Sequence, residues 1–214
     1  MSAQRLIGEY IGDNDKDIEN FNDMLMDNSA VVSGSVALRL LLGEGNYDNK
    51  DYDNSDLDIY VGSEVQHQGV VAHFIKEGSS WSVSSVRDGD YPMITKHFMY
   101  TTTLLNSVTN KKVQVCMVVH KLADDEEVEL SPQEAICLFD FTFLMNCYDG
   151  ENVFSAFPAD IRTKKGKVFN IQTLDPKRII KYAERGFQIL IDNFSLKNKS
   201  IDDVEFELQR IHSR

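Results

Sequence analysis

The strongest constraint on the fold is a short apolar segment that runs into a helical one with almost no connection between them. Residues 30–33 have the composition of a buried strand, and residues 36–42 have that of a buried helix. Only Gly34 and Ser35 separate the two segments. Because so short a connection forces a tight corner, the sequence predicts a strand, a turn and a helix in direct succession.

Two acids mark the start of the next predicted strand. After a loop rich in Gly, Asn and Asp (residues 43–55), residues 57–61 alternate as a strand does, and Asp56 and Asp58 lie two positions apart. Both carboxylates therefore project from the same face, about 6–7 Å apart along the backbone. Acids so close repel each other unless a cation lies between them, and Mg²⁺ takes one or two carboxylates together with substrate phosphate oxygens.

The position of this pair carries more information than its spacing. The chain contains 34 acidic residues, and the acid-x-acid spacing recurs elsewhere in it. Asp56 and Asp58 differ because they follow the Gly34–Ser35 corner by one helix and one loop. In such a corner Gly lets a phosphate approach the backbone, while the Ser hydroxyl and the free N–H groups of the helix offer donors. An ordinary turn capped by Ser35 is the alternative.

The rest of the pattern alternates between helices and strands. Helices are predicted at residues 17–27, 64–76, after Ser131-Pro132, and at 176–193 and 201–212, and strands at 81–86, 95–105, 111–119 and 140–147. Short turn-like connections make the three strands between 81 and 119 antiparallel neighbours. We expect residues 1–160 to form the core and residues 161–214 to form a helical extension packed on it.

Charge and apolar content restrict the partners. The net charge is −12 over 214 residues, and acidic residues crowd the first third of the chain. Such a surface repels phosphate backbones, so we expect no long nucleic acid to bind, although basic residues between 162 and 185 leave room for a short one. No apolar run reaches the roughly 18 residues that a membrane span needs, so we expect no membrane contact.

The three cysteines indicate the compartment. Cys116, Cys137 and Cys147 are odd in number, lie in apolar segments and lack the paired spacing of a metal site. We therefore expect buried, reduced thiols and an intracellular, cytoplasmic protein.

Two motifs together resemble a known family. The segment VVSGSVALRLLL, a loop and then SDLDIYV are similar to the signature of the nucleotidyltransferase (polymerase beta-like) superfamily, which is a strand, Gly-Ser, a helix, and acid-apolar-acid on the next strand. The stretches FDFTFLMNCYDG and KRIIKYAERGF resemble poorly characterised nucleotidyltransferase-like proteins of large DNA viruses and fungi. The specific motif covers roughly residues 30–61, and a looser similarity extends to about residue 187.

The resemblance implies both a fold and an activity. The fold would be α+β, with a nucleotidyltransferase-type mixed sheet flanked by helices and a C-terminal helical tail. The activity would be that of an ATP-binding transferase, which moves a nucleotidyl group from a nucleoside triphosphate to a hydroxyl with Mg²⁺ or Mn²⁺. Gly34 and Ser35 would bind the nucleotide, and Asp56 and Asp58 would bind the metal and act in catalysis. For a viral protein, the virion would be a second location.

One position departs from the family pattern. Active members usually carry a third carboxylate in the middle of a later strand, where this chain has Gln114. A neutral amide neither supplies the charge that holds a second metal nor deprotonates the acceptor hydroxyl. Asp140 would replace that carboxylate in catalysis if its strand lay beside Asp56. The alternative for Asp140 is a hydrogen-bonded carboxylate at the start of a strand.

Two basic residues complete the predicted nucleotide site. Lys181 and Arg185 lie four apart, on one face of a predicted helix, and would clamp a triphosphate. Alternatively, they lie in solvent or pair with Glu184 and Asp175.

The residues leave more than one function open. The first is a metal-dependent nucleotidyltransferase. The second is a catalytically degenerate pseudoenzyme on the same fold, which acts as a binding, scaffold or viral structural component with a protein partner, because a fold does not dictate an activity. A role in RNA modification or as part of a toxin–antitoxin pair follows the family more loosely.

Overall fold

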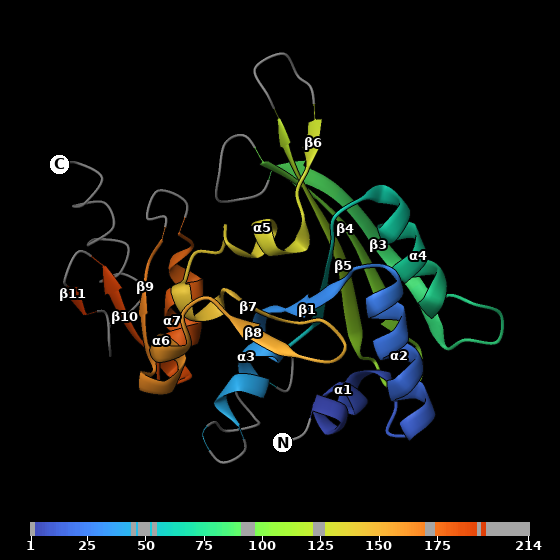
Figure 1. The fold of residues 1–214 in the computed structure, drawn as a ribbon, viewed down its shortest axis with the longest axis horizontal. Coiled ribbons are helices and arrows are strands. Elements are labelled where there is room, and N and C mark those ends of the chain that lie inside the picture. The colour runs from blue at the N-terminus through green and yellow to red at the C-terminus, as the bar shows by residue number, and fades with distance from the viewer. Residues whose placement is uncertain are drawn as a thin grey trace.

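A mixed eight-stranded sheet organises the computed structural model (Figure 1). The structure describes residues 3–43, 46, 52, 55–90, 97–121, 127–169, 174–191 and 194–195. The strand order is β3-β4-β5-β2-β1-β7-β8, with β6 paired to β5. The strands are β1 Val31–Ser33, β2 Leu57–Val61, β3 Trp81–Asp90, β4 His97–Asn106, β5 Lys112–Lys121, β6 Glu127–Glu129, β7 Asn146–Tyr148 and β8 Val153–Ser155. The pair β2 and β5 is parallel and the other neighbours are antiparallel.

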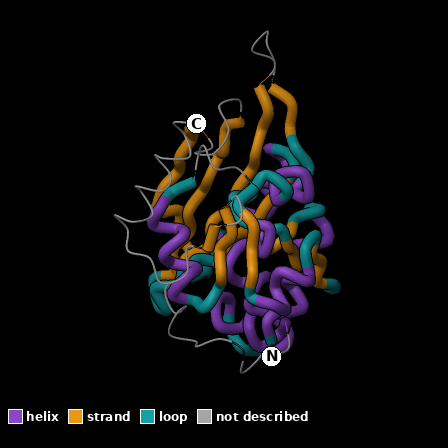
Figure 2. The backbone as a smooth tube through the Cα atoms, turned by 90° about the vertical axis from the view of Figure 1, so that its left-hand side faces the viewer, coloured by secondary structure: helices purple, strands orange, loops and turns teal. Residues whose placement is uncertain are grey.

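Helices cover the two faces of this sheet. They are α1 Ala3–Ile11, α2 Asp15–Asp27, α3 Gly34–Leu42, α4 Glu64–Phe74, α5 Pro132–Ile136, α6 Pro158–Thr163 and α7 Pro176–Glu184. In Figure 1, α1, α2 and α4 gather on one side of the sheet, and α5, α6 and α7 gather on the other. After a quarter turn, the strands run side by side with the helices packed along them (Figure 2). Within the described ranges, no helix combines the length and the apolar content that a bilayer crossing needs.

Each face of the sheet has its own apolar core. On the side of α2, one cluster joins Ile59 of β2 to Phe21. On the side of α7, the other cluster joins Tyr60 of β2 to Phe139, with ring centroids 5.4 Å apart. Because the central strands are apolar on both faces, a polar side chain in the middle of β2 or β5 stands out. Asp58 is such a residue.

Most of the predicted elements are present. The α+β class is confirmed, and β3, β4 and β5 are antiparallel neighbours as expected. The helix that begins after Ser131 carries a capping box with Glu134, which explains its sharp start. The opening helix α1 was not predicted from the sequence.

The strand predicted at residues 140–147 is wrong. The chain instead forms a 3-10 turn at Thr142–Leu144 (η2) and the short strand β7. The rings of Phe141 and Phe143 stack 5.1 Å apart, and Phe143 also stacks on Phe187 at 4.2 Å. The whole segment is buried, so its side chains do not alternate between core and solvent. The alternation of residue types in its sequence therefore does not indicate a strand.

The helix predicted at residues 176–193 is present only in its first half, and the second half of that prediction is wrong. Helix α7 ends at Glu184, and Gly186 has a left-handed φ of +84°, which stops the helix. The chain then forms β10 Gln188–Ile191, which pairs in parallel with β9 Lys165–Lys167 and antiparallel with β11 Phe194–Ser195. The buried side chains of Ile161, Ile179 and Phe187 belong to the same cluster as the core residue Leu38, so this segment packs on the core. The helix predicted at residues 201–212 lies outside the described residues.

The cysteine prediction needs one correction. All three thiols are free, and Cys116 and Cys147 are buried as expected. Cys137 is exposed, because it is the C-cap residue of the short helix α5 and does not lie inside an apolar layer.

Candidate functional site

The Gly34–Ser35 corner lies directly against Asp58. Gly34 begins α3 with a φ of +67°, a left-handed conformation that favours glycine. Ser33, the residue before it, pairs with Asp58 across β1 and β2. A side-chain carbon at Gly34 would lie 2.6 Å from Oδ2 of Asp58, so only glycine leaves room for that carboxylate. The structure therefore brings the corner and the second acid together.

The corner leaves the start of α3 without a side-chain cap. The N-cap residue Ser33 donates its hydroxyl to the carbonyl of Asn146, at 2.5 Å, and makes no capping bond to the helix. The first N–H groups of a helix have no partner within the helix, and they carry the positive end of its dipole. The beginning of α3 therefore offers donors to an anion beside Asp58.

The two acids repel each other in a partly buried place. Burial and the nearby charge of Asp56 raise the pKa of Asp58 from its usual 3.8 to about 7, against the opposing effect of Lys181 and Arg178. Burial also raises the pKa of Asp56. Carboxylates ionise easily only when they are solvated or paired with a cation, so this pair favours the binding of positive charge.

Gln114 lies beside the two acids. In the parallel ladder of β2 and β5, Gln114 is the direct partner of Asp58. Its side-chain Nε2 donates a hydrogen bond of 2.8 Å to Oδ2 of Asp56. The amide thus belongs to the same cluster of polar side chains as the two acids. It stabilises the negative charge of Asp56 without adding a charge of its own.

A cavity of about 430 Å³ opens in front of these residues. Its lining combines polar and aromatic side chains, and it comes from α3, β2, β4, β5, the segment that contains η2, and α7 with its N-cap. The lining residues are Gly34, Ser35, Asp58, Tyr60, Met99, Gln114, Cys116, Phe139, Leu144, Asp175, Arg178, Lys181 and Tyr182. A space of this size accepts a small ligand such as a nucleotide.

Two cations of α7 face the acids across this cavity. Lys181 and Arg178 are three residues apart, one helical turn, and both line the cavity. Burial, together with the neighbouring cations Arg185 and Arg178, lowers the pKa of Lys181. Lys181 was predicted from the sequence and Arg178 was not, although its spacing of three to Lys181 marks it as a residue of the same helix face.

Arg185 lies behind the cavity and holds the corner in place. The side chain is buried, and it donates hydrogen bonds to Oγ of Ser35 at 3.0 Å and to Oγ of Ser55 at 3.2 Å. Its guanidinium lies 3.9 Å from the ring centre of Tyr52. Of the predicted clamp, only Lys181 is among the described residues that line the cavity. Arg185 instead ties α7 to the start of α3, and it engages the hydroxyl of Ser35.

Tyr52 was missed because of its sequence context. It lies in the Gly-, Asn- and Asp-rich segment at residues 43–55, which was predicted to bury little, yet only 1% of its surface is exposed. Arg39 and Arg185 both stack near its ring, at 5.7 and 3.9 Å from the centroid. An aromatic residue inside a polar loop is the signal that would have found it.

Asp140 is not placed as the catalytic prediction required. It precedes η2 and belongs to no strand beside β2, whose neighbours are β1 and β5. Its carboxylate is fully buried and accepts two hydrogen bonds from Arg178, from Nε at 2.6 Å and from Nη2 at 2.9 Å. This bidentate pair fixes the direction of Arg178. Asp140 therefore acts on the cavity through Arg178.

An Asp140→Asn variant is expected to lose about 2–3 kcal/mol of unfolding free energy. The change leaves a buried amide where a carboxylate received two charged hydrogen bonds, and the part-exposed Arg178 recovers some hydration. Urea unfolding would measure the loss. Asp175→Asn on the same helix is the matched control, because Asn replaces Asp as an N-cap at almost no cost. Equal stability of Asp140→Asn and the wild type would contradict the structural role.

The two acids are better suited to hold one divalent cation together with a substrate than to form a metal site whose ligands all come from the protein. Among the described residues, no three or more His, Cys, Asp and Glu side chains gather as a metal cluster. Asp58 lines a cavity that has room for phosphate oxygens, and the charge of Asp56 lies close to it. Mg²⁺ is often held in this way, by one or two carboxylates and its substrate.

A scan against models of protein families finds no match to this chain, and a search of curated proteins finds none either.

Proposed function

We propose that this cavity binds a nucleoside triphosphate with Mg²⁺ or Mn²⁺ and transfers its nucleotidyl group to a hydroxyl. The observation that carries the proposal is the approach of Asp58 to Gly34. A carboxylate with a raised pKa lies against the open start of a helix, with Asp56 beside it and two cations across the cavity. The nucleotidyltransferase-type fold is part of the same proposal, and the sheet order and the motif at residues 30–61 support it.

Each group has a role in binding the donor. Asp56 and Asp58 hold the cation, which supplies positive charge to the phosphate oxygens. The N–H groups at the start of α3 and the side chains of Arg178 and Lys181 neutralise the rest of the triphosphate. The rings of Tyr60 and Phe139 in the cavity lining offer a surface for the base.

The transfer itself needs little beyond positioning. The acceptor oxygen bonds to the α-phosphorus while the bond from that phosphorus to the leaving pyrophosphate breaks. The hydroxyl proton passes to water, because the neutral amide of Gln114 does not accept it. A site of this kind works mainly by orientation and charge. We therefore expect slow transfer.

Thermal unfolding with a panel of nucleotides tests the proposal. Mg-ATP or another Mg-nucleotide at about 100 times its Kd should raise the melting temperature by about 5–10 °C, because a ligand that binds only the folded state stabilises it. The same nucleotide with EDTA should have a much smaller effect. Labelled nucleoside triphosphates then test for transfer. If neither nucleotide nor metal changes the melting temperature at millimolar concentration, the proposal fails.

Gln114 favours a second candidate, a pseudoenzyme that binds a nucleotide or a protein partner without transfer. Its amide is the direct partner of Asp58 in the sheet and neutralises no metal charge. The two candidates differ in one result. A Mg-nucleotide that stabilises the chain without any labelled product supports a binding role, whereas a labelled acceptor supports the enzyme.

A further inference from the structure

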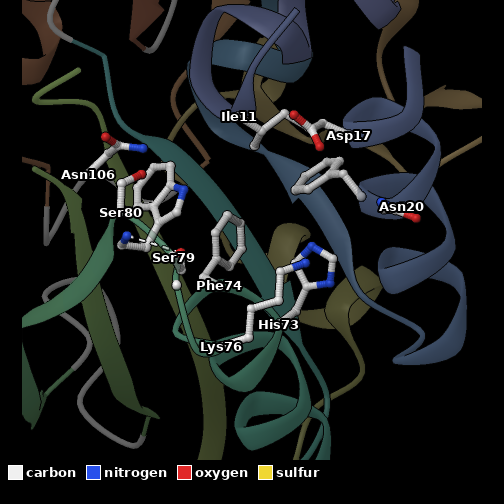
Figure 3. Close-up of a pocket in the computed structure, with 12 residues that line it drawn as sticks. Ile11, Asp17, Asn20, His73, Phe74, Lys76, Ser79, Ser80 and Asn106 are labelled. Atoms are coloured by element: carbon white, nitrogen blue, oxygen red, sulfur yellow. Dashed lines mark hydrogen bonds between the residues drawn. The ribbon is translucent and has the colours of Figure 1, made fainter. Parts of the chain in front are cut away.

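A second cavity, of about 340 Å³, lies on the other face of the sheet. It opens where α1 and α2 meet the end of α4 and the start of β3, far in the fold from α7 (Figures 1 and 3). Its lining residues are Ile11, Asp17, Asn20, Phe21, His73, Phe74, Lys76, Gly78, Ser79, Ser80, Trp81 and Asn106. It shares no residue with the candidate active site, so a ligand here is independent of the proposed transfer.

Aromatic rings form the floor of this cavity. The ring of Phe74 lies 5.1 Å from Trp81, 5.5 Å from His73 and 6.3 Å from Phe21, each in an edge-to-face arrangement. Phe21 and Phe74 are buried, while Trp81 and His73 keep part of their surface accessible. Such a floor favours a flat aromatic ligand, which gains both apolar contact and ring geometry.

One wall carries a hydrogen-bond donor that faces the cavity. Asn106 is 6% exposed, and its Oδ1 accepts the backbone N–H groups of Val108 and Thr109 at 2.9 and 3.0 Å. These two bonds fix the orientation of the amide, so Nδ2 points away from the backbone of Val108 and Thr109. None of the described residues accepts a hydrogen bond from this Nδ2. In Figure 3 its nitrogen points from the side of Ser80 toward the interior of the cavity. Solvent reaches Nδ2 in the cavity, so water hydrates it, and a ligand that accepts its hydrogen takes the place of that water.

The opposite wall carries the exposed carboxylate of Asp17, whose Oδ2 accepts a hydrogen bond from Asn14 and whose Oδ1 remains as a second acceptor. Figure 3 places Asp17 and Asn20 of α2 across the cavity from Asn106, with Phe74 between the two walls. Burial and the nearby Lys76 lower the pKa of His73. The cavity thus presents a donor on one side, a carboxylate on the other, and rings below.

We propose that this cavity binds a small nitrogen heteroaromatic of nucleobase size. Its ring contacts Phe74 and Trp81, a ring nitrogen or carbonyl accepts from Asn106, and an amino group donates to Asp17. A purely apolar ring leaves both polar walls without partners, and a purely polar ligand leaves the aromatic floor bare. Ligands with both features are therefore preferred.

Trp81 makes the proposal directly testable, because it is the only tryptophan of the chain. Adenosine and cytidine, without phosphates or metal, should change its fluorescence in a saturable way. Benzylamine, an aromatic amine that lacks a ring acceptor, should bind about tenfold more weakly or worse, which corresponds to the loss of one hydrogen bond. Equal binding of benzylamine, or no saturable change with either nucleoside at millimolar concentration, would overturn the proposal.

Asn106→Asp is the sharpest variant. The new carboxylate still accepts the N–H groups of Val108 and Thr109, so the turn is kept, but the donor that faces the cavity becomes an acceptor. Affinity for adenosine should fall by about tenfold or more. Asn152→Asp, in the exposed turn between β7 and β8, makes the same change of charge elsewhere and should bind like the wild type. Unchanged affinity in Asn106→Asp would refute the assigned contact.

Two further variants keep the test decisive if Asn106→Asp folds poorly. Asp17→Asn removes the carboxylate from the opposite wall and should also weaken adenosine binding several-fold, at about the value of one hydrogen bond. Asp58→Asn changes only the candidate active site and should leave the Trp81 signal intact. Loss of the signal in Asp58→Asn would show that the nucleoside binds in the other cavity, and it would overturn this proposal without affecting the proposed transfer.

Discussion

Without metal and at about pH 8, an Asp58→Asn variant is expected to be more stable than the wild type by about 2–4 kcal/mol. The wild-type carboxylate must ionise beside Asp56 and away from bulk water, as its raised pKa of about 7 indicates. Asparagine has the same shape and no charge. Thermal unfolding would measure the gain, at about 2–4 °C for each kcal/mol in a chain of this length.

The pH dependence follows from the direction of the pKa shift. In the unfolded chain this carboxyl loses its proton near the usual pKa of 3.8, and in the folded chain near a pKa of about 7. The folded state therefore binds one more proton between these values, and its stability falls as the pH rises through that window. The variant lacks this titration. Its stability should match that of the wild type near the lower pKa and exceed it increasingly above.

Divalent metal should reverse the order of the two proteins. Mg²⁺ or Mn²⁺ satisfies the acids of the wild type and raises its melting temperature, whereas Asp58→Asn should respond little and lose transfer by about 10²–10³-fold. Asp23→Asn, on the exposed face of α2, removes one acid elsewhere and should behave like the wild type. A metal-free wild type that is more stable than Asp58→Asn at about pH 8 would show that the acids are already satisfied by the protein.

The part of the site that could be predicted from the sequence is local in the chain. The turn at Gly34 can be predicted from the strand before it and the helix after it. Asp58 lies on the next strand, and the alternation of that strand fixes the face on which its side chain lies. These inferences rest on periodicity and turn length. The place of Gln114 was expected instead from the resemblance to the nucleotidyltransferase pattern, because β2 and β5 are parallel strands that lie far apart in the sequence.

The part that could not be predicted depends on contacts between distant segments. Arg185 reaches Ser35 across 150 positions of sequence, and Arg178 reaches Asp140 across 38. Helical spacing shows that Lys181 and Arg185 share a side of α7, but not which of them faces the cavity. Burial of the helix against Tyr52 decides that question, and a tyrosine in a polar loop gives no periodic signal.

Replacement of Gln114 by Glu is expected to change the activity most. The substitution keeps the size of the side chain and places a third carboxylate beside Asp56 and Asp58 at the paired position of β5. If the chain is a nucleotidyltransferase limited by its missing acid, transfer from labelled nucleoside triphosphates should rise by about 10²–10⁴-fold, the usual contribution of a positioned base. A radiolabelled transfer assay with Mg²⁺ and with Mn²⁺ would measure it.

The same substitution should make the folded state depend on metal. Glu at this position replaces the 2.8 Å hydrogen bond to Asp56 with a repulsion, so the metal-free variant should lose about 2 kcal/mol. Divalent metal should restore that loss, because a cation among three carboxylates is held more tightly than one between two. Gln114→Met, which keeps the size and removes the polar group, should show neither the gain in transfer nor the stronger metal response. Should Gln114→Glu respond to metal no more than Gln114→Met does, position 114 does not face a metal site, and the proposed binding of a cation by Asp56 and Asp58 beside it is contradicted.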